Sequence, residues 1–152
     1  MKRLLFILLA VAVAACGKEN TTPDNGPDTG KPDEVPTVTM TEKLIGEWHS
    51  KSLATDADIY ISFAEDKTFE LYQQIGEGSY RLYRGTWSLD EKTCILSGKY
   101  NDGEAWGTSY SVTAEEATLT LTSTDASAEK STYKSEEIPE SVKSSCITIV
   151  KC

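Results

Sequence analysis

Histidine and basic residues are scarce in this chain of 152 residues. The sequence has a single histidine, His49, so a metal site built from several histidines is excluded. Lysine and arginine number 15 against 24 aspartates and glutamates, which gives a formal net charge of −9. Proteins that bind nucleic acid need a basic surface to displace the counterions of the phosphates. We therefore expect no nucleic-acid partner, no metal and no cofactor.

The sequence also lacks an apolar run long enough to cross a bilayer. Its longest apolar stretch, residues 4–15, has about twelve residues, whereas a spanning helix needs roughly 20. Two basic residues precede this stretch and two alanines end it. A basic start, a short apolar core and small residues before a cleavage point are typical of a secretory signal peptide. Residues 1–15 are therefore predicted to be a signal peptide.

The cysteine that follows this stretch changes the expected processing. Val13-Ala14-Ala15-Cys16 resembles the lipobox of bacterial lipoproteins. The resemblance implies cleavage before Cys16, a lipid on its sulfur and acylation of the new amino terminus, for example by palmitate. Gly17 stands where an aspartate would resemble an inner-membrane retention signal, so the resemblance implies the outer membrane. Two or more acyl chains give stable attachment, and the side of the membrane stays open.

Residues 16–38 are predicted to be a disordered tether. Four of the five prolines lie between Gly17 and Pro36, where Val35 is the only sizeable apolar residue. Such a segment cannot bury enough apolar surface to offset the entropy of ordering. Its prolines favour extended conformations, which would hold the following domain clear of the lipid headgroups.

Residues 39–152 alternate apolar and polar side chains with the period of β-strands. Strands are expected near 46–53, 58–64, 67–74, 79–89, 93–99, 107–113, 117–123 and 146–151. A further strand at 131–137 and a helical turn opened by Pro139 are open alternatives. Short turns such as Asn101-Asp102-Gly103 favour antiparallel pairing of sequential strands. The pattern predicts an all-β domain, an antiparallel up-and-down barrel of about eight strands, because closure removes exposed sheet edges.

Three short motifs carry a resemblance to a known family. Gly46-Glu47-Trp48 opens the first expected strand, residues 61–69 form a strand, turn and strand, and a second Gly-x-Trp follows at Gly85-Thr86-Trp87. Together they resemble the small lipocalin-like domains of bacterial envelope lipoproteins over residues 44–150. The resemblance implies a lipocalin-like barrel in which Gly46 and Trp48 close one end. Its interior would hold either packed side chains or one small ligand.

The middle of the domain is rich in aromatic residues. Tyrosine and tryptophan combine an apolar body with a polar group, which suits the wall of a ligand site. They equally fill a barrel core or form cross-strand pairs. The candidate ligand-lining residues are Tyr80, Tyr83, Trp87, Trp106 and Tyr110.

No set of residues indicates catalysis. Two Ser-x-x-Lys matches, at 127–130 and 131–134, lack the companion motifs of the enzymes that use this sequence. His49 is expected on the strand face opposite to Trp48, and the sequence singles out no nucleophile for it to activate. The chain is therefore expected not to be an enzyme.

Three cysteines remain once Cys16 is lipidated: Cys94, Cys146 and Cys152. The cell envelope permits disulfides. Cys146 and Cys152 would lie about 20 Å apart on one extended strand, beyond bridging distance. Any bridge should therefore join Cys94 to one of the other two, and the absence of a bridge is an equal alternative.

Two functions stay open for the barrel, as does its oligomeric state. In the first, the lipid-anchored domain binds a small apolar or amphipathic ligand non-covalently. In the second, the barrel is filled, and its loops and aromatic residues contact a protein or glycan of the cell envelope. A cavity of ligand size would favour the first function, and a solid interior the second.

Overall fold

The computed structural model describes residues 38–149. The predicted signal peptide, Cys16 and all of the predicted tether except Val38 lie outside the described residues. Within the described part of the chain, no helix is long and apolar enough to span a bilayer.

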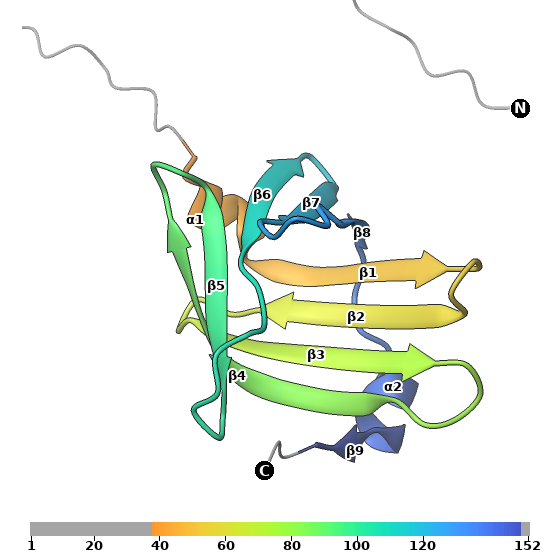
Figure 1. The fold of residues 1–152 in the computed structure, drawn as a ribbon. Coiled ribbons are helices and arrows are strands. Elements are labelled where there is room, and N and C mark those ends of the chain that lie inside the picture. The colour runs from red at the N-terminus through yellow and green to blue at the C-terminus, as the bar shows by residue number, and fades with distance from the viewer. Residues whose placement is uncertain (1–37, 150–152) are drawn as a thin grey trace, which may run out of the picture. The chain divides into compact units, whose positions relative to one another are not determined.

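Eight antiparallel strands form a closed ring, in which every strand pairs with its neighbours along the chain (Figure 1). They are β1 (Gly46–Ser52), β2 (Ala57–Phe63), β3 (Thr68–Ile75), β4 (Arg81–Asp90), β5 (Ile95–Tyr100), β6 (Tyr110–Glu115), β7 (Thr118–Ser123) and β8 (Lys130–Ser135). β8 returns to β1 through the pairs Trp48–Ser135 and His49–Lys134, which closes the ring. The predicted up-and-down barrel is confirmed.

The strand that closes the barrel is not the one expected. The prediction placed the eighth strand at 146–151, whereas the structure closes the ring with β8, which was only an alternative. The short strand β9 (Ile147–Thr148) instead lies outside the ring and pairs in parallel with β4. The sequence of β8 hides its role because Tyr133 is its only buried side chain. Ile147 is apolar but 57% exposed, so its apolar character misled the assignment.

A short helix, α1 (Met40–Leu44), precedes β1 and is absent from the predicted strand pattern. Thr39 and Glu42 form a capping box: the Thr39 hydroxyl accepts from the Glu42 N–H, and the Glu42 carboxylate accepts from the Thr39 N–H. The Glu91 carboxylate, in the β4–β5 turn, accepts from the N–H groups of Met40 and Thr41. The Thr-x-x-Glu spacing is a sequence signal that would have identified this helix.

The interior of the barrel next to α1 is filled. Leu44 is fully buried there, and Trp48 is 4% exposed. The Trp48 indole N–H donates to the Leu44 carbonyl at 2.9 Å, which ties the first strand to the helix. The other buried members of this core are Ile61, Phe63, Phe69, Trp87, Leu96, Val112, Ala114, Leu119, Leu121 and Tyr133.

Residues 136–149, which we name the C-terminal strap, cover part of the outer face of the barrel. The strap contains α2 (Glu140–Ser145), which Pro139 directly precedes, so the predicted helical turn is confirmed. Its apolar side chains meet outward-facing residues of β2, β3 and β4. This second apolar cluster consists of Tyr60, Tyr72, Leu82, Ile138 and Val142.

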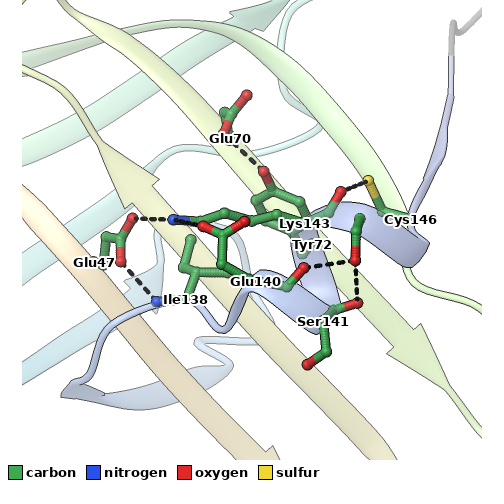
Figure 2. A network of polar contacts seen from close by, with 9 residues as sticks. Glu47, Glu70, Tyr72, Ile138, Glu140, Ser141, Lys143 and Cys146 are labelled. Carbon is green, nitrogen blue, oxygen red and sulfur yellow. Dashed lines mark hydrogen bonds and ion pairs between the residues drawn. The ribbon is translucent and has the colours of Figure 1, made fainter.

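Polar contacts fasten the strap to the barrel (Figure 2). The Glu47 carboxylate on β1 accepts hydrogen bonds from the Ile138 N–H at 2.6 Å and from the Lys143 ammonium at 3.4 Å.

The Tyr72 hydroxyl donates to the Glu70 carboxylate at 2.8 Å. Burial raises the pKa of Glu70, but hydrogen bonds from Arg84 and Tyr72 outweigh it, so the net pKa lies below the usual value.

Candidate functional site

The barrel opens at the end opposite α1, where the β1–β2, β3–β4, β5–β6 and β7–β8 connections lie. We name this end the mouth. β1 pairs with β2 along its whole length, but only its residues Trp48 and His49 pair with β8. β5 and β6 pair only at Ile95–Ser111 and Leu96–Tyr110. Residues 50–52 of β1 and 97–100 of β5 continue toward the mouth without pairing across these seams, so both seams are open there.

A cavity of about 140 Å³ lies in this mouth. It is lined by Ile61, Phe69, Leu71, Tyr100, Trp106, Gly107, Tyr110, Leu121, Ser131 and Tyr133. Cavities of roughly 150 Å³ with leucine, isoleucine and phenylalanine walls stay dry and accept benzene. The space is therefore sufficient for one small ring or a short alkyl group.

Trp106 forms one wall because the β5–β6 connection folds back on β5. Lys99 and Ala105 form an isolated antiparallel β-bridge. The main-chain N–H of Trp106 donates to the Gly98 carbonyl at 2.9 Å. The indole lies directly against Gly98, where a Cβ would be 2.4 Å from the ring. The ring also meets Phe69 edge to face, with centroids 5.0 Å apart. A glycine opposite Trp106 thus lets the ring turn inward over the mouth.

The cavity walls carry no charge near neutral pH. Among the lining residues that the structure describes, tyrosine is the only ionisable type. Burial raises the pKa of Tyr133 to about 12, and burial also raises the pKa of Tyr110. Both phenols therefore stay protonated, and the site favours an uncharged apolar group.

The predicted ligand-lining residues separate into four places. Trp106 and Tyr110 lie at the cavity. Tyr83 lines a small adjoining hollow of about 40 Å³, which it shares with Tyr100. Trp87 is 3% exposed in the filled core, and Tyr80 packs against the second cluster outside the barrel. Tyr83 and Trp87 share one face of β4 but are about 13 Å apart along it, so one cavity cannot contact both rings equally.

Several lining residues were not among the sequence candidates. Phe69 and Leu71 are on the inner face of β3, where the alternation with Glu70 already indicated an inward position. Tyr133 is absent from the candidates because the prediction gives a strand at 131–137 only as an alternative. Its place beside Phe69 depends on closure of the barrel, which brings β8 and β3 to the same interior.

His49 lies on the outer face, opposite to Trp48, as predicted. Its ring stacks on Tyr60 with centroids 4.1 Å apart. One ring nitrogen lies 2.8 Å from Asp58 and the other 2.8 Å from Glu136, at the start of the strap. The imidazole thus links β1, β2 and the strap, which is a structural role.

The described residues include no group of three or more side chains arranged to hold a metal ion. Cys94 and Cys146 are both free thiols. Cys152, the third predicted bridging candidate, lies outside the described residues.

Comparisons with known proteins place this architecture in a family. No curated protein matches the sequence. A solved NMR structure of a protein from Bacteroides uniformis ATCC 8492 is similar at a TM-score of 0.48 and 17% identity, covering 62% of this chain and 90% of that chain. The family model of the lipocalin-like domain matches residues 44–121, just over half of the sequence. The match begins at Leu44, whose carbonyl accepts from the Trp48 indole, and ends at Leu121 in the cavity wall. Because the match covers more than half of the sequence, the chain belongs to the lipocalin-like domain family.

Proposed function

We propose that the domain binds a small apolar ligand, or the apolar end of an amphipathic one, in the mouth of the barrel without covalent chemistry. One observation carries the proposal: an uncharged, aromatic-lined cavity lies at the open end of an otherwise filled barrel. Aromatic and aliphatic walls with few polar groups are typical of small-molecule sites. A ligand of one ring is expected to bind with a Kd of roughly 0.1–1 mM, because so few atoms contribute.

We also propose that binding takes place at the outer membrane of a bacterium, with the domain tethered through a lipidated Cys16. The lipobox-like sequence supports this location. The described chain begins at Val38, directly before α1, so a tether would join at the end remote from the mouth.

Replacement of Cys16 by serine tests the anchor. Serine has no thiol to receive the lipid, so the Cys16→Ser protein should leave the membrane fraction or accumulate with its signal peptide uncleaved. Membrane fractionation and intact mass measurement of both proteins give the result. A Cys16→Ser protein that stays in the membrane at the processed mass would contradict lipid anchoring.

A second candidate function, contact with an envelope protein or glycan, is favoured by apolar side chains at the rim of the mouth. Leu53 is 90% exposed, Ile75 66% and Ile147 57%. Large apolar side chains in water commonly mark contact surfaces when they lie together. The filled core and the modest cavity volume are compatible with this function too.

Toluene is a suitable probe of the cavity, and the three indole N–H resonances report where it binds. Toluene should shift the Trp106 indole signal saturably in a proton–nitrogen correlation spectrum of the purified protein. The Trp48 and Trp87 signals should hardly move, since both side chains are buried and their N–H groups already donate to the carbonyls of Leu44 and Thr68. Trp106→Phe removes one signal and assigns it.

Two substitutions on β8 provide the matched control for the toluene experiment. Ser131→Leu adds an isobutyl group to the cavity wall and should abolish the Trp106 shift. Thr132→Leu adds the same group on the exposed outer face and should leave the shift unchanged. If toluene moves no indole signal, or moves all three without saturation, the cavity is not a ligand site.

A further inference from the structure

A second hollow extends from the mouth along the inner face of β3 and β4. β4 runs beyond the end of β5, and β9 takes the vacant edge through the pairs Arg81–Ile147 and Leu82–Thr148. The result is a groove of about 440 Å³. It is lined by Gln73, Ile75, Glu77, Gly78, Ser79, Arg81, Ile147 and Ile149.

Arg81 stands out in this groove because its charge is not neutralised. Among residues 38–149, no carboxylate lies within ion-pair distance of Arg81, although Glu77 lines the same groove. Arg84, by contrast, pairs with Glu70 at 2.7 Å. Acidic residues exceed basic ones in this chain, so an unpaired guanidinium between isoleucines is a specific feature of the site rather than part of a general basic surface.

The register of the strands places donors and apolar side chains side by side. Arg81 lies opposite Gln73 on β3 and opposite Ile147 on β9. A guanidinium fork and a neighbouring amide NH₂ can together satisfy the two oxygens of one carboxylate. A phosphate dianion would require more donors and more positive charge than these two side chains supply. Charge and geometry both therefore favour a carboxylate.

The groove and the cavity are close enough to hold two ends of one molecule. Leu71, in the cavity wall, and Gln73, in the groove, are successive inward positions of β3, about 7 Å apart. The small hollow between Tyr83 and Ile149 shares Tyr100 with the cavity wall and Ile149 with the groove wall, so the two spaces lie near each other.

We propose that Arg81 and Gln73 bind the carboxylate of an amphipathic ligand whose ring or short alkyl end occupies the cavity. This inference rests on the proposed ligand-binding function and specifies its ligand class, a small aryl or alkyl carboxylate. The side chains of Ile75 and Ile147 line the groove on either side of Arg81, which is itself exposed, so a carboxylate can reach the guanidinium from solvent.

Binding of 3-phenylpropanoate and of its uncharged analogue 3-phenylpropan-1-ol to the purified protein tests the inference. Both should shift the Trp106 indole signal, and the carboxylate should bind more tightly. Arg81→Gln should weaken phenylpropanoate binding about tenfold, the effect of one charge-assisted hydrogen bond of roughly 1.4 kcal/mol. Phenylpropanol binding should change less than about twofold, since the alcohol gains little from the positive charge.

Lys92→Gln is the matched control, because it removes one positive charge from the exposed β4–β5 turn at the far end of the barrel. It should leave both affinities unchanged. An equal loss in Lys92→Gln and Arg81→Gln would show a long-range charge effect and overturn the Arg81 site. Equal binding of acid and alcohol to the wild-type protein would overturn the Arg81 site while leaving ligand binding in the cavity intact. If neither compound nor toluene binds, the proposed function itself fails.

Discussion

Trp48→Ala is expected to lower the free energy of unfolding by about 3–5 kcal/mol. The side chain is 4% exposed and belongs to the core that fills the barrel next to α1. Truncation leaves a cavity that the surrounding strands cannot close, because their spacing is fixed by backbone pairing. It also removes the donor to the Leu44 carbonyl, a hydrogen bond that holds α1 against β1. Urea unfolding, followed by circular dichroism, measures the loss.

Trp48→Phe separates the two contributions of Trp48. Phenylalanine keeps most of the apolar volume but lacks the N–H donor, so this substitution should cost about 1–2 kcal/mol. Trp106→Ala is a useful comparison, since Trp106 is half-buried at the mouth and its loss should cost less than that of Trp48. A loss below about 1 kcal/mol for Trp48→Ala would contradict a role of Trp48 in the core.

The barrel could be predicted from the sequence because its inner and outer faces differ in polarity along most strands. β2 and β3 alternate so clearly that the pattern puts Phe63 and Phe69 on the apolar face of each strand. The same reasoning fails at the end of the chain, where β8 has one buried side chain and β9 has an exposed isoleucine. Apolar content predicts burial only where a strand has a partner surface, and the location of that surface is a tertiary property.

The site was less predictable than the fold. Trp106 and Tyr110 were among the candidates because aromatic residues cluster in that part of the sequence. Their separation from Trp87 follows from the distance along β4, which the clustering in sequence does not show. The cavity exists because two seams lose their pairing toward the mouth, and no local sequence signal encodes a missing pair.

The C-terminal strap illustrates the same limit. Pro139 indicated a helical turn, but its position on the outside of the barrel depends on Tyr60, Tyr72 and Leu82, which face away from the core. In an isolated barrel these outward residues would be exposed apolar surface. The strap covers them. Its last strand, β9, places Ile147 opposite Arg81 of β4, and with Gln73 of β3 these residues form the groove beside the mouth. The strand first assigned to the barrel wall thus contributes to the proposed carboxylate site, and Ile138 and Val142 of the strap contribute to the outer cluster.

Gly85→Ala is expected to destabilise the fold more than any other exchange of glycine for alanine in β4 or the β5–β6 connection. A Cβ at this position would lie 1.9 Å from the Lys99 carbonyl oxygen and 2.8 Å from the Phe69 ring. The carbonyl cannot retreat without breaking the pairing of β4 with β5, which starts at Gly85 and Tyr100. We therefore expect a loss of about 4 kcal/mol or more, at the upper end of overpacking effects.

Gly107→Ala is the matched control for Gly85→Ala, and the pair separates close packing from a general effect of removing glycine. No atom lies within 4 Å of a Cβ at Gly107, and its backbone is outside the positive-φ region. The exchange should change the free energy of unfolding by less than about 0.5 kcal/mol, or slightly stabilise the protein by restricting the unfolded chain. Urea unfolding of both variants gives the comparison. Similar stabilities for the two would mean that β4 and β5 do not approach each other at Gly85, and that the barrel wall is wider there than its strand register requires.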